Sequence, residues 1–422
     1  MAKKKMPDRA RAKQPRRKRR GVAIAGLAVV TCVVAAASIV QVFTVLAQWL
    51  NPAMALAVEP GNAVANARLG DFTLVTLKKP DDIPRVLPQV EQLALRSFRA
   101  QPINSEAVRE LAWVAMLRGQ QERSKRLIDL ALAMSRRELG ASLVEEEFAR
   151  RRGDVATAML RADTAMRTSD EARDVLLPTL TANLGDPSWR LAIANRLAKS
   201  PAWGPAFWNS VIGGKVPAGN LVALRMLLPR NDDSVSRNYT NAIFKQAIDQ
   251  NVPEAALALF RYLVGSRAAD QLVSSPQPFG AQGWPPFSWQ MFSTGSYLAG
   301  TPKGSTDLTY TILPRAAAGV LARRLLAYPA GLYTFTVRAQ PGGRQSAGEA
   351  VWRLTCAKDN RELGRLDPAS LASGNGVLSL AVTIPQDCPF QWVRFENAPN
   401  RGQEPIAGTV RSAGLTKRIA GA

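Results

Sequence analysis

An uncharged, apolar segment of thirty residues near the start of the chain is the feature that most constrains its fold. Residues 21–50 contain no Asp, Glu, Lys or Arg, and Gln41 and Gln48 are their only strongly polar members. An α-helix rises about 1.5 Å per residue, so about 20 such residues cross the hydrocarbon core of a bilayer. The sequence therefore predicts a transmembrane helix, which we place at residues 21–46.

A strongly basic segment comes before this apolar one. Residues 1–20 carry eleven Lys and Arg side chains and one acid. The net charge of this segment is therefore nearly half of the +22 carried by the whole chain. Because basic flanks stay on the cytoplasmic side of a membrane, we predict a cytoplasmic tail over residues 1–20 that touches anionic lipid. The rest of the chain would then lie in the periplasm, or its equivalent, of a bacterial envelope.

Two other interpretations of the first fifty residues compete with a retained anchor. Ala53, Ala55 and Ala57 provide small residues at the spacing of a signal-peptide cleavage site, so cleaved secretion is one alternative. A nucleic-acid-binding arm would explain the basic run, but it would leave the apolar run unexplained. Nucleic acid is therefore not the partner that we expect.

The composition excludes most familiar catalytic chemistry. The 422 residues include no histidine, which removes the commonest general base and every Ser/His or Cys/His catalytic pair. Residues 295–301 have the glycine spacing of a phosphate-binding loop, but Thr301 and Pro302 stand where Lys and Ser or Thr are required. We therefore expect no cofactor, no metal ion and no enzymatic activity.

One catalytic alternative stays open, a carboxylate-dependent glycan hydrolase or lyase. Such an enzyme needs two carboxyl groups on either side of the scissile bond. The acids available for this role in the C-terminal region are Asp359, Glu362, Asp367, Asp387, Glu396 and Glu404.

The middle of the chain repeats itself with a period of 34 residues. Gly119 and Gly153 lie 34 residues apart, and each is followed by small or apolar residues five, nine and twelve positions later. Glycine ends a helix readily in the left-handed conformation, and small residues let a second helix pack closely against the first. The residues that we expect to pack in this way are Ser124, Ile128 and Ala131 in one unit, and Ala158, Ala162 and Ala165 in the next.

This period and these small residues resemble the tetratricopeptide repeat. The resemblance implies an α-solenoid over residues 55–268, with roughly five helical pairs between residues 59 and 265. Stacked helical pairs leave a concave face that commonly holds a peptide or a protein partner. The alternative is that the alanines and leucines form only a core and that the concave face binds nothing.

The sequence changes character near residue 270. Residues 269–288 are rich in proline and aromatic residues, which predicts a linker. Alternating apolar and polar residues then predict eight short strands, which favours an antiparallel β-sandwich over residues 289–418. The first strand is expected over residues 289–297, and none is expected between Cys356 and Leu378. The expected fold class is therefore multidomain, α then β: one transmembrane helix, a helical solenoid and a C-terminal sandwich.

The order of elements in the C-terminal region resembles carbohydrate-binding modules with a jelly-roll fold. The resemblance consists of a Trp-rich start, a Pro-x-Gly-x-Tyr turn at residues 329–333, and late strands that carry Cys388 and Trp392. It implies a glycan ligand.

Three tryptophans are candidates for a platform on which such a ligand would stack. If Val393 and Phe395 face inward, alternation along the strand directs Trp392 outward, and an exposed ring suits sugar stacking. Trp284 and Trp289 are further candidates. For all three, packing inside the protein is the alternative.

Cys356 and Cys388 are a candidate disulfide pair. They belong to the same predicted domain, and disulfides persist in the oxidising compartment that the membrane topology implies. The alternative is two independent buried thiols.

These predictions together describe a single-pass envelope protein that acts as a scaffold. Its helical repeats would bind an envelope protein, and its sandwich would dock on glycan or on another envelope subunit. Assembly or export of a surface polysaccharide would suit this layout.

Overall fold

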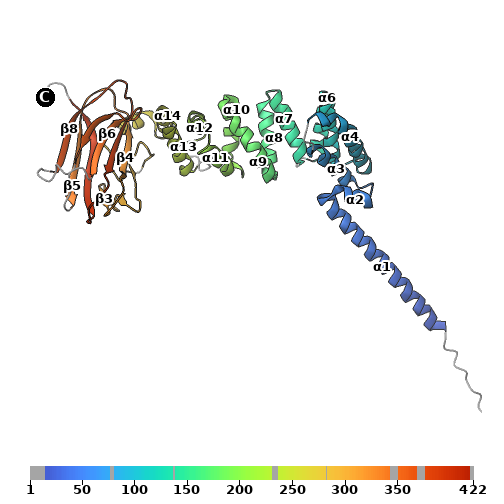
Figure 1. Cartoon of the computed structure of the whole chain (residues 1–422). Helices are drawn as coiled ribbons and strands as arrows, with labels where there is room; N and C mark the ends of the chain where they lie inside the picture. The colour runs from blue at the N-terminus through green and yellow to red at the C-terminus, as the bar shows by residue number, and fades with distance from the viewer. Residues whose placement is uncertain are drawn as a thin grey trace, which may run out of the picture. The chain divides into compact units, whose positions relative to one another are not determined.

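The structure is a computed structural model that describes residues 15–76, 80–135, 138–230, 236–281, 283–342, 350–367 and 376–418. Within these residues, fifteen α-helices are followed by two antiparallel β-sheets (Figure 1). The predicted fold class, helices followed by a sandwich, is therefore confirmed. The chain forms two compact units, Met1–Ser169 and Asp170–Ala422, which are described separately below.

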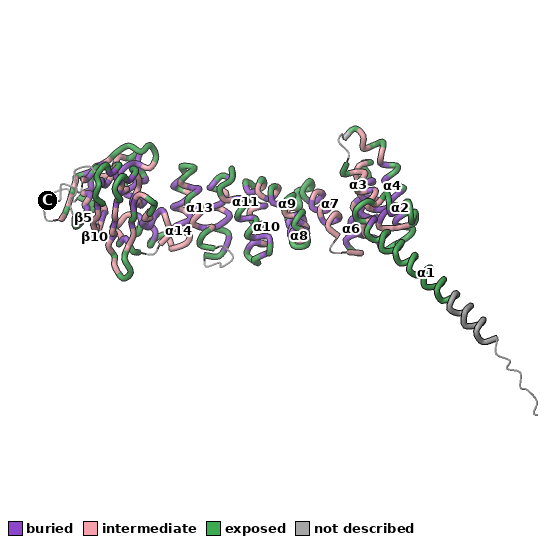
Figure 2. The backbone as a smooth tube through the Cα atoms, turned by 60° about the horizontal axis from the view of Figure 1, so that its bottom comes forward, coloured by how far each residue is buried: buried purple, intermediate pink, exposed green. Residues whose placement is uncertain are grey.

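The first helix, α1 (Pro15–Leu50), contains the predicted transmembrane segment. Its part Gly26–Leu50 is long and apolar enough to cross a membrane, and almost all of its residues are exposed (Figure 2). By length and composition this helix fits a membrane anchor or a signal sequence. Asn51 caps the next helix, α2 (Pro52–Val58), by accepting a hydrogen bond from the Met54 amide. Residues 1–14 of the predicted basic tail lie outside the described residues.

The first unit continues with three helical pairs. The bounds of the second pair recur in the third with every residue number shifted by 34. This repeat in the structure has the period of the sequence repeat. The helices are α3 (Ala63–Val75) and α4 (Ile83–Ala100), α5 (Ser105–Leu117) and α6 (Gln121–Met134), and α7 (Leu139–Arg151) and α8 (Val155–Thr168).

The turns inside the second and third pairs have the same geometry. Gly119 and Gly153 adopt φ values of 77° and 74°, a region that a Cβ atom makes unfavourable. Each glycine amide bonds the carbonyl three residues back, and the following amide bonds the carbonyl five residues back. The helices after these turns bury all six residues singled out by the repeat pattern: Ser124, Ile128, Ala131, Ala158, Ala162 and Ala165.

The second unit begins with seven helices. Alternate helices lie side by side, because α9 packs on α11, α10 on α12 and α12 on α14. Helix α13 also packs on both α12 and α14. The helices of this unit are α9 (Asp170–Ala182), α10 (Pro187–Leu197), α11 (Gly204–Val211), α12 (Ala218–Met226), α13 (Arg237–Asp249), α14 (Pro253–Val264) and α15 (Ser266–Val273).

Two five-stranded sheets complete the second unit, with strand orders β1-β4-β9-β6-β7 and β2-β3-β10-β5-β8. Neighbouring strands pair antiparallel throughout. The strands are β1 (Gln290–Met291), β2 (Tyr297–Gly300), β3 (Leu308–Ile312), β4 (Gly319–Leu326), β5 (Gly331–Gly342), β6 (Ala350–Cys356), β7 (Glu362–Leu366), β8 (Val377–Ile384), β9 (Gln391–Asn397) and β10 (Ile406–Lys417).

The strand predictions were wrong at two places. The expected strand from Trp289 to Tyr297 is divided between β1 and β2, which belong to different sheets. The strand β7 was missed because charged residues and Gly364 interrupt its apolar pattern. That glycine is needed in the strand, since a Cβ atom there would lie 2.7 Å from Val382 Cγ1 on β8.

Residues 269–288, predicted as a linker, contribute to the core of the second unit. Arg324 of β4 is buried, and its guanidinium donates hydrogen bonds to the carbonyls of Phe287, Ser275 and Leu272. The Phe287 ring in turn stacks on Phe260 of α14 at 4.8 Å. Buried hydrogen bonds and ring packing therefore join the last helices to the sandwich.

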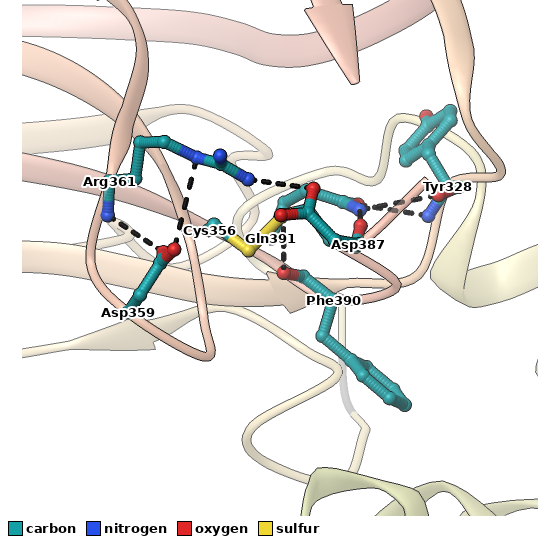
Figure 3. The surroundings of a disulfide bond; sticks show 8 residues. Tyr328, Cys356, Asp359, Arg361, Asp387, Phe390 and Gln391 are labelled. Atoms are coloured by element: carbon teal, nitrogen blue, oxygen red, sulfur yellow. Dashed lines mark hydrogen bonds and ion pairs between the residues drawn. A yellow bond between two sulfur atoms is a disulfide. The ribbon is translucent and has the colours of Figure 1, made fainter. Parts of the chain in front are cut away.

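The predicted disulfide between Cys356 and Cys388 is present, with the Cα atoms 5.6 Å apart (Figure 3). It links the end of β6 to the turn before β9 and closes a loop across 32 residues of sequence. Beside it, Arg361 lies between Asp359 and Asp387 and forms ion pairs with both carboxylates.

Candidate functional site

A pocket of about 350 Å³ lies on the first helices of the three pairs in the first unit. Apolar side chains form most of its wall, and one buried arginine lies among them. We call it the Arg109 pocket; it is lined by Asp71, Leu74 and Val75 of α3, Ile83 of α4, Arg109, Trp113 and Leu117 of α5, and Gly140 and Leu143 of α7.

The guanidinium of Arg109 links three helical pairs. It binds both carboxylate oxygens of Asp71 on α3, and its Nε donates to Glu138 Oε1 at 3.0 Å. Glu138 also caps α7 by accepting the Ala141 amide. Gly140 leaves room for this arrangement, because a Cβ atom there would lie 2.4 Å from Arg109 Cδ. The ion pairs of Arg109 with Asp71 and Glu138 thus fix the helices that surround the pocket.

Burial and these charges change the protonation of the groups around Arg109. Burial alone would lower the pKa of Arg109, but the hydrogen bonds and charge of Asp71, with the charge of Glu138, raise it above its ordinary value. Burial raises the pKa of Glu110 well above its ordinary value, and the Asp71 carboxylate raises it further. Burial also raises the pKa of Glu106. Arg109 therefore stays charged, whereas Glu110 takes up a proton more readily than an exposed glutamate.

A second pocket, of about 400 Å³, lies in the second unit between α13 and the first sheet. We call it the Trp392 pocket. Its wall combines two aromatic rings with amide, acidic and basic side chains; it is lined by Asn241, Ala242, Lys245, Ile248 and Asp249 of α13, by Pro285 and Pro286, and by Gln290, Phe292, Arg323 and Trp392.

Trp392 faces away from the sandwich core, as the alternation along β9 predicted. Val393 and Phe395 belong to the core, whereas Trp392 lies on the opposite face with Arg394. The guanidinium carbons of Arg323 and Arg394 lie 5.0 Å and 5.6 Å from its ring centroid. Only 5% of the Trp392 residue is exposed, so it forms a wall of the pocket rather than an open platform.

The other two candidate tryptophans lie elsewhere. Trp289 is in the sandwich core, where its ring packs edge-on against Trp352 and its indole N–H donates to the Gln277 carbonyl. It offers no face to a ligand, because core packing covers the ring. Trp284 is half-buried, packs against Phe244, and carries the Arg237 guanidinium over its ring at 4.6 Å.

The polar side chains that line the Trp392 pocket are two amides, one acid and two bases. Arg323 Nε donates to Gln290 Oε1 at 2.9 Å, and Lys245 forms an ion pair with Asp249 one helical turn later. Burial lowers the pKa of Arg323, and the Arg394 guanidinium lowers it further. Burial likewise lowers the pKa of Arg394. The Asp249 carboxylate opposes the shift at Arg323, and the Glu396 carboxylate opposes the shift at Arg394.

Four of the six carboxylates considered for glycan hydrolysis are held in ion pairs. Glu362 and Glu396 both bind Arg353, and Asp359 and Asp387 both bind Arg361. The hydrogen bond from Arg361 lowers the pKa of Asp387, whereas a general acid needs a raised pKa. This pairing gives Asp387 no support as a catalytic acid.

Sequence reasoning missed Arg109, Arg323 and Lys245. Arg109 and Glu110 are charged neighbours in an otherwise apolar stretch of helix, which was a signal for a buried ion pair. Arg323 and Lys245 gave no such signal, because 78 positions separate them in sequence and folding alone brings them to one pocket.

Comparison with known proteins adds no family to this description. The sequence matches no protein-family model, and no curated protein has significant similarity to it.

Proposed function

We propose that this protein is a membrane-anchored scaffold of the bacterial envelope. In this proposal α1 holds the chain in the inner membrane, the helical repeats bind a segment of a protein partner, and the sandwich docks on glycan. The observation that carries the proposal is the apolar Arg109 pocket on α3, α5 and α7. A concave, mostly apolar pocket formed by consecutive repeats is typical of a ligand-binding site.

The chemistry of the Arg109 pocket favours a peptide segment as its ligand. Its apolar wall suits side chains such as Leu or Phe, and Val75, which lines it, is 83% exposed. A repeat of 34 residues with glycine turns and buried small residues is similar to the tetratricopeptide repeat, whose concave face commonly binds such segments.

The Trp392 pocket supports the second part of the proposal. Aromatic rings with nearby amide and charged side chains are the groups that hold a sugar, since the rings contact C–H faces and the polar groups bind hydroxyls. The domain also consists of two antiparallel sheets, and in this it is similar to carbohydrate-binding jelly rolls. Assembly or export of a surface polysaccharide would use both binding surfaces.

The location proposed for these domains agrees with two properties of the chain. The apolar helix α1 is long enough to cross a bilayer, and the basic residues before it would stay in the cytoplasm. The Cys356–Cys388 disulfide is stable in an oxidising compartment such as the periplasm.

Site-specific photocrosslinking in living cells tests the scaffold role. A photoreactive amino acid is placed at Val75 or Leu143, which line the Arg109 pocket, and at Leu160 on α8 as an exposed control. We expect the two pocket positions to give the same discrete crosslinked protein and Leu160 to give none. The proposal fails if the pocket positions give no discrete product or if Leu160 gives the same one.

A further inference from the structure

Four arginines stand in one row across the first sheet of the sandwich. Arg323 of β4 is directly opposite Arg394 of β9, Arg394 is opposite Arg353 of β6, and Arg353 is opposite Arg365 of β7. Residues directly opposite in antiparallel strands share one face of the sheet. The neighbouring positions Val393, Trp352 and Leu354 belong to the core, so the row lies on the outer face.

Only one member of this row is neutralised by acids. Arg353 lies 3.4 Å from Glu396 and 3.7 Å from Glu362. Among the residues that the structure describes, no carboxylate lies within ion-pair distance of Arg323, Arg394 or Arg365. Arg394 instead donates to the side-chain oxygen of Asn360 at 3.1 Å. The row therefore keeps a surplus of positive charge.

Such a row is unfavourable for folding by itself. Like charges directly opposite each other in a sheet are destabilising, and Arg323 and Arg394 are both half-buried, which limits screening by water. An anion that binds between these guanidinium groups would remove the repulsion. Planar guanidinium groups bind carboxylates through two parallel hydrogen bonds, so a carboxylate is the anion that fits best.

The surroundings of Arg323, at one end of the row, indicate which kind of carboxylate ligand fits. Arg323 belongs both to the row and to the Trp392 pocket, where Phe292, Asn241 and Gln290 also line the wall. A pocket of about 400 Å³ with aromatic and amide groups suits a sugar ring. Beyond the pocket, each following strand carries one arginine of the row, and neighbouring strands lie about 4.8 Å apart, which suits an extended chain that carries acids repeatedly.

We propose that the arginine row and the Trp392 pocket bind an acidic polysaccharide, a glycan whose sugar residues carry carboxylate groups. The inference rests on the proposed function of the sandwich in glycan docking and specifies the class of glycan. A sugar ring occupies the Trp392 pocket, its carboxylate binds Arg323 and Arg394, and later residues of the chain pass over Arg353 and Arg365.

Binding to the full-length protein in detergent tests this inference. The probe is a galacturonic acid oligosaccharide, and its methyl ester serves as the uncharged counterpart. The key variant is Arg323→Gln/Arg394→Gln, and the matched control is Arg338→Gln/Arg411→Gln, which removes the same charge from exposed positions of the second sheet. We expect the key variant to bind the acidic probe at least about tenfold more weakly, because it loses charge-assisted hydrogen bonds, and the control to bind within about twofold of the natural protein.

A stability measurement separates lost binding from lost folding. Because the substitutions remove repulsion between opposite strands, we expect the melting temperature of the key variant without ligand to equal or exceed that of the natural protein. Weaker binding with unchanged melting then assigns the effect to the missing guanidinium groups.

The remaining outcomes overturn the inference in distinguishable ways. Equal loss of binding in both double variants would assign the effect to total charge and not to the row. Equal binding of polyglutamate, of duplex DNA or of phosphatidylglycerol vesicles would assign the row to polyanions in general. If the methyl ester bound as tightly as the acid, the inference that the glycan is acidic would fail, but the proposed glycan docking would stand. If neither sugar bound, the inference and the proposed glycan docking would both fail.

Discussion

Two buried arginines illustrate how single residues are stabilised in this protein. Arg109 is surrounded by carboxylates, which raise its pKa, whereas Arg324 binds only backbone carbonyls, and burial lowers its pKa to about 10. In both cases the partners come from other elements of the chain. Removal of either arginine would leave buried oxygen atoms without a donor, which typically destabilises a protein by about 1 to 3 kcal/mol per group.

Glu110 gives a prediction about pH at the residue scale. Its pKa is higher in the folded protein than in the unfolded chain, mainly because of burial, although Arg109 opposes the shift. Its contribution to stability is therefore fully present below the unfolded pKa, near 4.3, and is lost as pH rises through the folded pKa. We expect Glu110→Gln to reduce this loss of stability, because the amide stays uncharged at every pH and needs no proton in the folded protein.

Hydrogen exchange of α5 peptides, corrected for the pH dependence of chemical exchange, measures this effect between acid and neutral pH. Glu122→Gln on the exposed face of α6 is the control. Identical pH profiles for the natural protein and Glu110→Gln would contradict the prediction.

At the scale of elements, the helical pairs depend on their turns as much as on their buried faces. The two turns at Gly119 and Gly153 have nearly the same φ and the same hydrogen bonds, although the helices around them differ in sequence. The repeat is therefore a repeat of geometry, and the glycines and small residues are the parts of the sequence that this geometry requires.

Replacement of either turn glycine tests this interpretation. We expect Gly119→Ala and Gly153→Ala each to lower the unfolding free energy by about 1 to 2 kcal/mol, because a Cβ atom is strained at positive φ. Gly61→Ala is the matched control in the same unit, since its φ is not positive and its surroundings are open. Denaturant titration followed by circular dichroism measures both effects, and a neutral result at Gly119 would contradict the expectation.

The disulfide provides a second prediction at this scale. Cys356 and Cys388 close a loop across 32 residues, for which chain entropy predicts about 4 kcal/mol of stabilisation. We expect Cys356→Ala/Cys388→Ala and the reduced natural protein to lose a similar amount in the sandwich transition. Cys32→Ala, which removes the free cysteine of α1, should leave that transition unchanged. A stable sandwich after reduction would show that the covalent link contributes little.

For the whole molecule, α1 would, as a membrane anchor, set by its orientation the compartment in which both pockets lie. If α1 is a retained anchor with its basic end in the cytoplasm, protease added to intact spheroplasts should digest the chain after α1 and leave the N-terminal segment protected. Sequencing the N-terminus of the mature protein distinguishes retention from cleavage after residue 57. Digestion only after lysis would contradict the proposed orientation, and with it the periplasmic scaffold.

The sequence by itself determined the order of the architecture, because that order depends on local patterns. Uncharged residues 21–50 predicted a long apolar helix, the 34-residue spacing of Gly119 and Gly153 predicted paired helices, and alternating apolar residues predicted strands. These signals depend on neighbours within a few turns of chain, so they can be read without a structure.

Only the tertiary structure decided which residues meet. It placed Trp289 in the core, joined Lys245 of α13 to the Trp392 pocket, and aligned Arg323 with arginines from three other strands. Strand order and register produce these neighbours, and neither follows from local alternation, because a strand with the same pattern can pair with several others. The sites therefore depend on long-range pairing, whereas the elements that carry them depend on local sequence.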